Sequence, residues 1–255
     1  MSRLLRTIRL LALATAVTLV AGGLIACASD DDAGASNPRP TSEEGEPTPT
    51  EPASRSSQAD PADAFRSMSI PGDLTDGYFF GDPDAPLQLA VYEDFQCPFC
   101  LQFTLASEPE IVEKFVLEGK LRLEFRNLPI LGQDSANAAF AAQCAADADA
   151  FWPLHKELFL AQYEAGQLTD EELNVGRFAK EELLRFARTA GLDAAAFETC
   201  LADPATYDAV LTQAREANQL GIRSTPSFFL NGQPLARYPA GPAEWSAFLE
   251  NALAE

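Results

Sequence analysis

Residues 94–103 read DFQCPFCLQF, and the two cysteines of this stretch, Cys97 and Cys100, are separated only by Pro98 and Phe99. A pair this close is typical of half a zinc site, of a structural disulfide or of a redox couple. The residues that flank the pair, and the composition of the whole chain, separate these three interpretations.

The pair lies where a strand is expected to turn into a helix. Residues 87–95 (LQLAVYEDF) alternate in part and are rich in apolar and aromatic side chains, which predicts a strand. Residues 101–120 have helical character, with a kink expected at Pro109 and a stop near Gly119. Pro98 stands just inside the predicted helix start, where proline is favoured.

This position has consequences for the chemistry of the cysteines. The unpaired N–H groups and the positive dipole end of a helix N-terminus stabilise a thiolate, which is the form that attacks disulfides. We expect Cys97, at the exposed end of the turn, to be the nucleophile, with a pKa between about 4 and 6.5. Cys100, more buried, is expected to be the resolving thiol, so that the two form a redox disulfide.

Composition argues against the other interpretations and against several kinds of partner. Zinc needs four ligands, usually from two such knuckles, but the sequence has no second Cys-X-X-Cys and a single histidine, His155. A structural disulfide across so short a loop stabilises the fold little, because it removes little entropy from the unfolded chain. We therefore expect neither a metal nor a cofactor, and His155 to lie on a helix surface or partly buried. The formal charge of -20 disfavours nucleic acid as a partner.

The amino-terminus has the layout of an export signal. Residues 1–26 contain three arginines followed by an uncharged apolar run from Leu10 to Ala26. The run ends in Leu-Ile-Ala-Cys, which resembles the lipobox of bacterial lipoproteins, and that resemblance implies that Cys27 is lipidated. The alternative is an uncleaved membrane anchor, since the run is nearly long enough to span a bilayer. Both place the rest of the chain outside the cytoplasm, and we expect a lipid anchor in the cell membrane.

The next segment is expected to be a tether. Residues 27–69 are acidic and rich in proline, serine and threonine, and this composition cannot bury enough apolar surface to offset the chain entropy. The chain as a whole is 47% hydrophobic, enough for one sizeable core. We therefore predict a disordered tether over residues 27–69 and one folded domain over residues 70–255.

Two blocks of the sequence resemble the DsbA-like thiol–disulfide oxidoreductases of the thioredoxin superfamily. Residues 81–100 (GDPDAPLQLAVYEDFQCPFC) resemble the first strand and active site of that family, and residues 221–233 (GIRSTPSFFLNGQ) resemble its second landmark. In the family a Thr-Pro with a cis peptide bond faces the cysteine pair, and here these residues are Thr225 and Pro226. The resemblance implies an α/β, thioredoxin-like fold with an all-helical insertion at about residues 134–220.

The resemblance also implies a function. It implies an enzyme that introduces disulfides into reduced or unfolded exported proteins and that a membrane thiol oxidase reoxidises. A disulfide reductase or isomerase of the same fold, and a non-enzymatic binding lipoprotein with a structural disulfide, stay open. The best-known strong oxidant of the family has histidine before the second cysteine, whereas this chain has Phe99. We therefore expect a less oxidising potential, about -200 to -130 mV.

Two further cysteines and two acids complete the candidate residues. Cys144 and Cys200 are expected to face inward from the insertion, and an oxidising compartment favours a structural disulfide between them. Two separate buried thiols are the alternative. Glu93 and Asp94 are either surface charges or include one residue that exchanges a proton with Cys100, and the candidate for that role is Asp94.

Overall fold

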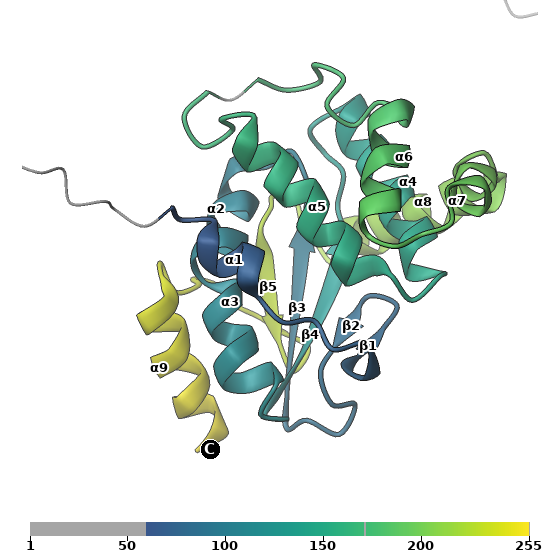
Figure 1. The fold of residues 1–255 in the computed structure, drawn as a ribbon. Helices are drawn as coiled ribbons and strands as arrows, with labels where there is room; N and C mark the ends of the chain where they lie inside the picture. Colours follow the sequence, from purple (N-terminus) through teal and green to yellow (C-terminus); the bar gives the residue numbers. More distant parts are fainter. Residues whose placement is uncertain (1–59, 171, 255) are drawn as a thin grey trace, which may run out of the picture. The chain divides into compact units, whose positions relative to one another are not determined.

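A six-stranded mixed sheet is the centre of the computed structural model, which describes residues 60–170 and 172–254 (Figure 1). The strands lie in the order β1-β2-β4-β3-β5-β6. Their bounds are β1 Thr75–Asp76, β2 Phe79–Phe80, β3 Leu87–Glu93, β4 Leu121–Asn127, β5 Ser227–Leu230 and β6 Gln233–Pro234.

Strands β3 and β4 form the middle of the sheet. They are parallel and pair along their whole length, from Leu87 opposite Leu121 to Glu93 opposite Asn127. Strand β5 runs antiparallel to β3 on its other side. Because the carboxyl end of β3 lies inside the sheet, the turn that follows it has a rigid support on both sides.

The chain between β3 and β4 forms a helix that breaks once. Helix α2 (Pro98–Ala106) is followed by α3 (Glu108–Ile111) and by the π-helical segment η2 (Val112–Val116). The interruption at Ser107 lies two residues before Pro109, which has no N–H to continue the helical ladder. Gly119, with a φ of 68°, lies in the turn that leads to β4, where a residue with a side chain would be strained.

Among the described residues, five helices follow β4 and make up the insertion before β5. They are α4 Gln133–Ala146, α5 Phe151–Glu164, α6 Lys180–Thr189, α7 Ala194–Leu201 and α8 Pro204–Gln219. The carboxylates of Asp193 and Asp203 accept backbone N–H groups at the starts of α7 and α8, which is how short polar residues begin helices. In Figure 1 the green helices α6, α7 and α8 lie on the opposite side of the sheet's centre from α9 (Pro242–Leu253).

The folded part begins earlier than predicted. Helix α1 (Asp63–Ser67) lies within the segment expected to be tether, and its Phe65 is fully buried. Met68 is also buried. The tether prediction is therefore wrong for residues 60–69, because two apolar side chains in a polar segment are enough to dock one short helix on the core.

Aromatic rings fill the space between the sheet and helix α5. Phe125 of β4 stacks on Phe95 with ring centroids 5.2 Å apart and packs against Phe151 of α5 at 4.7 Å. On the other side of α2, Trp245 of α9 packs against Phe103 of α2 at 5.6 Å. One cluster thus holds Phe95 in the turn before α2 and the other holds Phe103 within α2, which fixes the position of the helix amino-terminus.

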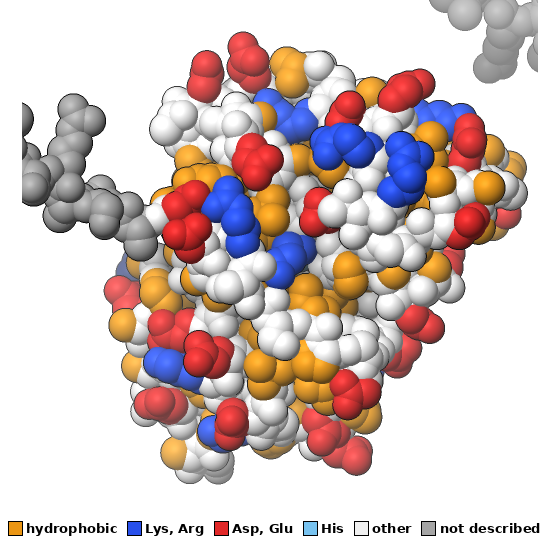
Figure 2. Space-filling model, in the orientation of Figure 1, with side chains coloured by type: hydrophobic (Ala, Val, Ile, Leu, Met, Phe, Trp, Pro, Cys, Tyr) orange, Lys and Arg blue, Asp and Glu red, His pale blue; other side chains and the backbone are white. Residues whose placement is uncertain are grey.

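Charged side chains of both signs are mixed over the face shown in Figure 2. Arg66 pairs with Asp60 at 2.7 Å and with Glu164 at 3.5 Å. Exposed pairs of this kind add little stability. On this face the excess of acidic residues is not gathered into one patch.

The amino-terminal predictions lie outside the described residues. These are the signal peptide at residues 1–26, the lipidation of Cys27 and the tether up to residue 59. Within residues 60–170 and 172–254, the helices are too short or too polar to cross a membrane.

Candidate active site

The cysteine pair stands where β3 turns into α2. The N–H of Cys97 donates to the carbonyl oxygen of Asp94 at 2.9 Å and closes the turn after the strand. Cys97 is the N-cap of α2, and Pro98 is its first residue. Both cysteines are free thiols; Cys97 is 4% exposed and Cys100 is fully buried. Cys97 is therefore less exposed than expected, whereas Phe99 between the two is 61% exposed.

The loop before β5 covers the first thiol. The peptide bond between Thr225 and Pro226 is cis, and the Sγ of Cys97 donates to the carbonyl oxygen of Thr225 at 3.3 Å. This contact joins residues 128 positions apart, so the two blocks recognised in the sequence meet at the thiol. The ring of Pro226 is buried, so this residue adds no exposed apolar surface beside the thiols.

The two thiols differ in acidity. A hydrogen bond from the thiol of Cys100 lowers the pKa of Cys97 from 9.0 to about 6, with help from Thr225 and from the backbone N–H groups of Phe99 and Cys100, and against the effect of burial. Burial raises the pKa of Cys100 well above its ordinary value, and the charge of Glu93 adds to this. At neutral pH, Cys97 is therefore mostly thiolate and Cys100 is a thiol, an arrangement that suits a nucleophile and a resolving residue.

Asp94 holds the active-site turn in shape. Its Oδ1 accepts the N–H of Gln96 at 2.8 Å and the hydroxyl of Ser135 at 2.6 Å. Its Oδ2 accepts the N–H groups of Ile130 and Leu131 at 2.8 and 3.0 Å. Burial raises the pKa of Asp94, but these four donors all favour its charged form. This arrangement argues against the predicted role of Asp94 as a proton carrier.

Glu93 is the carboxyl with an unpartnered oxygen near the thiols. It ends β3 and is buried, and its Oε1 has no hydrogen-bond partner among the described residues. Burial raises the pKa of Glu93 well above its ordinary value, and the charges of Glu108 and Cys97 raise it further. His155 lies beside it and is 1% exposed. The surface or half-buried position predicted for His155 is wrong, because aromatic rings enclose it.

A buried glutamine ties the active-site turn to the insertion. The side-chain amide of Gln96, the residue before the nucleophile, donates to the hydroxyl of Ser135 at 2.8 Å and accepts the N–H of Asn174 at 2.7 Å. The side chain of Gln167 donates to the carbonyl oxygen of Gln96 at 3.1 Å. Sequence reasoning missed these residues, and the only signal was a polar residue directly before Cys97 in a strand-to-helix turn.

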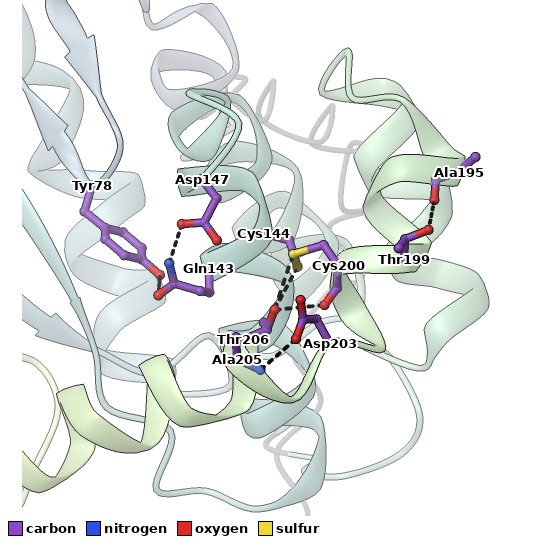
Figure 3. The surroundings of a disulfide bond; sticks show 10 residues. All are labelled: Tyr78, Gln143, Cys144, Asp147, Ala195, Thr199, Cys200, Asp203, Ala205 and Thr206. Atoms are coloured by element: carbon purple, nitrogen blue, oxygen red, sulfur yellow. Dashed lines mark hydrogen bonds between the residues drawn. A yellow bond between two sulfur atoms is a disulfide. The ribbon is translucent and has the colours of Figure 1, made fainter.

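A second cysteine pair lies within the insertion. Cys144 of α4 and Cys200 of α7 form a disulfide that closes a sequence separation of 56 residues (Figure 3). The hydroxyl of Thr206 in α8 donates to the carbonyl oxygen of Cys200 at 2.8 Å. The disulfide therefore joins α4 to α7, the hydroxyl of Thr206 connects α8 to them, and this disulfide is separate from the redox pair.

Three exposed apolar or aromatic side chains come from segments near the thiols. Phe99 lies between the two cysteines. Ile130 lies near the active-site turn, because its backbone N–H donates to the carboxylate of Asp94. Burial raises the pKa of the Tyr238 hydroxyl, and the charges of Cys100 and Cys97 raise it further, so Tyr238 lies near the redox pair. Its ring packs against Phe228 of β5 with centroids 4.7 Å apart. Exposed apolar side chains therefore occur in the active-site turn itself and in two segments near it.

Comparison with known proteins agrees with this geometry. A family model described as thioredoxin matches residues 74–251. The probable disulfide bond formation protein D of Bacillus anthracis is 28% identical over 155 residues, which are 60% of this chain and 68% of that protein. The Na⁺/H⁺ antiporter NhaA 3 of Salinispora tropica is 30% identical over 168 residues, which are 65% of this chain and only 23% of the antiporter.

The crystal structure of oxidised BdbD from Bacillus subtilis is 24% identical in sequence and has a TM-score of 0.60 against this chain. The match covers 73% of this chain and 96% of BdbD. The family match and this superposition confirm the α/β, thioredoxin-like fold with an all-helical insertion.

Proposed function

The chain belongs to the thioredoxin family, in its DsbA-like branch, and on that premise we propose that it introduces disulfides into exported proteins. It is a thiol–disulfide oxidoreductase, and the proposal concerns the direction and the place of its reaction. The observation that carries the proposal is the contrast between an acidic Cys97 and a buried, weakly acidic Cys100.

The proposed reaction begins with the oxidised pair. A thiolate of the substrate protein attacks the Sγ of Cys97, a bond forms between these two sulfurs, and the electron pair of the broken bond goes to Cys100. A second thiolate of the substrate then attacks the substrate sulfur of this mixed disulfide. Cys97 leaves as a thiolate, and the substrate leaves with a new disulfide. A membrane thiol oxidase removes the two electrons from the reduced pair.

The acidity of Cys97 supports the oxidising direction. A thiolate that is stabilised in the reduced protein makes the disulfide easier to reduce, and hence a better oxidant. A pKa of about 6 lies between the values of about 7 for thioredoxin and about 3.5 for DsbA. This agrees with a potential of about -200 to -130 mV, above the roughly -270 mV of the reductase thioredoxin.

The proposed location rests on the amino-terminal sequence. The signal peptide and the lipobox cysteine, Cys27, are expected to place the domain on the extracytoplasmic side of the cell membrane, held by lipid. An acidic, proline-rich tether would leave the domain free to reach exported chains as they emerge. It would also let the domain reach an oxidase in the same membrane.

Equilibration with glutathione tests the direction of electron flow. The fraction of reduced protein, measured over a series of glutathione ratios, gives the potential. A value of about -200 to -130 mV supports an oxidase, whereas a value near -270 mV would favour the reductase of the same fold.

Trapping of substrates tests the roles of the two cysteines. In a secreting cell, Cys100→Ser should accumulate mixed disulfides on non-reducing gels, because the resolving thiol is gone. Cys97→Ser should accumulate none. Adducts of equal strength on both variants would contradict the assignment of Cys97 as the nucleophile.

A further inference from the structure

A charged residue of the insertion is linked, through two buried glutamines, to the backbone directly before the nucleophilic cysteine. The Nη1 of Arg177 donates to the side-chain oxygen of Gln162 in α5 and, at 3.1 Å, to that of Gln167. The amide nitrogen of Gln162 donates in turn to the carbonyl oxygen of Phe95 at 2.6 Å. The amide nitrogen of Gln167 donates to the carbonyl oxygen of Gln96 at 3.1 Å. We call Arg177, Gln162 and Gln167 the amide clamp.

The clamp completes the hold on two successive peptide groups. The peptide that leads into Gln96 is held at its N–H by Oδ1 of Asp94, at 2.8 Å, and at its oxygen by Gln162. The peptide that leads into Cys97 is held at its N–H by the backbone oxygen of Asp94, at 2.9 Å, and at its oxygen by Gln167. Because a peptide group is planar, contacts at both ends fix its rotation.

The orientation of these two peptides matters for a negative charge on Cys97. Their carbonyl oxygens, which carry partial negative charge, are directed at the two glutamines of the insertion. The Sγ of Cys97 also has to stay beside the thiol of Cys100 and the N–H groups at the start of α2, which lower its pKa. Rotation of either peptide would move Cys97 relative to these donors or turn a carbonyl oxygen toward its sulfur, and both changes disfavour the thiolate.

The guanidinium makes the clamp stronger than two glutamines would be alone. Each glutamine satisfies both neighbours in one orientation only, because a guanidinium only donates and a backbone carbonyl only accepts. A hydrogen bond to a charged group is stronger than a neutral one, and linked hydrogen bonds polarise one another where water is excluded. Gln162 and Gln167 are fully buried, whereas Arg177 is partly exposed.

The backbone around Arg177 is held without its guanidinium. The N–H groups of Gly176 and Arg177 both donate to Oδ2 of Asp134 in α4, at 2.8 and 3.0 Å. The side chain of Asn174 donates to the carbonyl oxygen of Leu131 at 2.8 Å. A change of the Arg177 side chain therefore removes the outer end of the clamp and leaves these backbone contacts in place.

We propose that Arg177 is a positioning residue for the redox reaction: through Gln162 and Gln167 it holds the two peptides before the nucleophilic cysteine and so makes the disulfide of the pair easier to reduce. The effect on the sulfur is indirect and passes through the two glutamines. This inference rests on the proposed function, since a disulfide that is easier to reduce is a better oxidant.

Arg177→Met tests the proposal, because methionine keeps an apolar stem and removes every donor. The acid constant of Cys97, followed by thiolate absorbance in the reduced protein, should fall about tenfold, which moves the pKa from about 6 to about 7. At pH 7 the equilibrium constant of the pair against glutathione should then fall about fivefold, or about 20 mV. Arg177→Lys keeps a charged donor and should lie closer to wild type.

Arg185→Met is the matched control. Arg185 of α6 lines the same pocket as Arg177, but its guanidinium donates to Glu182, at 2.8 Å. This control should keep the wild-type acid constant and equilibrium constant. An equal shift in Arg185→Met would overturn the proposal, because any lost surface charge would then have the same effect. A folded Arg177→Met that loses stability in urea but keeps both constants would also overturn it, because the arginine would then be structural alone.

A second variant decides if Arg177→Met does not fold. Gln167→Met loses the donor to the carbonyl oxygen of Gln96 and should raise the pKa of Cys97 in the same direction, whereas a wild-type value overturns the clamp. If neither variant folds, nuclear magnetic resonance of the reduced wild-type protein decides. The side-chain amide signals of Gln162 and Gln167 should shift with the midpoint of Cys97, and signals that stay fixed overturn the clamp.

The proposed function fails in a different experiment. A wild-type potential near -270 mV would overturn the oxidising direction of the reaction. It would leave the clamp standing, because the clamp predicts the difference between wild type and Arg177→Met and not the wild-type value itself.

Discussion

Removing the thiol of Cys100 should make Cys97 a weaker acid. The hydrogen bond from Cys100 is the largest of the effects that lower the pKa of Cys97 to about 6. In Cys100→Ala the donor is lost, while the helix N-terminus and Thr225 remain. The expected result is a Cys97 that titrates between the present value and that of an ordinary thiol.

The size of the change follows from the strength of the lost hydrogen bond. A hydrogen bond to a charged group contributes roughly 1.5–3 kcal/mol, and one pKa unit corresponds to about 1.4 kcal/mol. The pKa of Cys97 should therefore rise by about 1–2 units, to about 7–8. At pH 7, the thiolate fraction should fall from about nine-tenths to between about a tenth and a half.

The ultraviolet absorbance of the thiolate, followed against pH in the reduced protein, measures this pKa. The pH dependence of the alkylation rate of Cys97 gives a second, independent value. Cys100→Ser is the matched control, because its hydroxyl still donates a hydrogen bond and should keep the midpoint closer to wild type. A Cys100→Ala protein that titrates within a few tenths of a unit of wild type would refute the reasoning, and the helix N-terminus would then be the main cause of the acidity.

Stability and anchoring can be tested in the same protein. The pKa of Cys97 in the folded dithiol lies below its ordinary 9.0, so the reduced form should gain stability relative to the oxidised form as the pH rises from about 6 to 9 and lose it as the pH falls through about 6. At pH 7 this pKa shift should add about 1.4 kcal/mol to the free energy of unfolding of the reduced form. Thermal unfolding of the reduced and oxidised forms over a pH series measures it. Replacing Cys144 and Cys200 by alanine should lower the free energy of unfolding in urea by about 2–4 kcal/mol and leave the pKa of Cys97 unchanged. Cys27→Ser should appear in the soluble fraction with its activity intact, whereas firm retention in the membrane fraction would favour an uncleaved helix.

Local patterns in the sequence predicted the frame of the site. An apolar strand, the Cys-Pro-Phe-Cys turn and a helix that begins at Pro98 are set by residues within a few positions of one another. The resemblance then indicated that Thr225 and Pro226 belong beside this turn, although they come 128 residues later. Such features can be predicted from the sequence, because each is determined either by backbone preferences or by a recognisable motif.

Only the tertiary structure decided what the polar residues around the thiols do. Glu93 and Asp94 are neighbours in the chain, yet N–H groups of residues 130 and 131 occupy Asp94, while Glu93 faces the aromatic core. His155 was expected on a helix surface or partly buried, and it is enclosed because a strand, a turn and two other helices converge on it. Burial and hydrogen bonding depend on segments that lie far apart in the sequence, and these two quantities set the acidity of every group at this site.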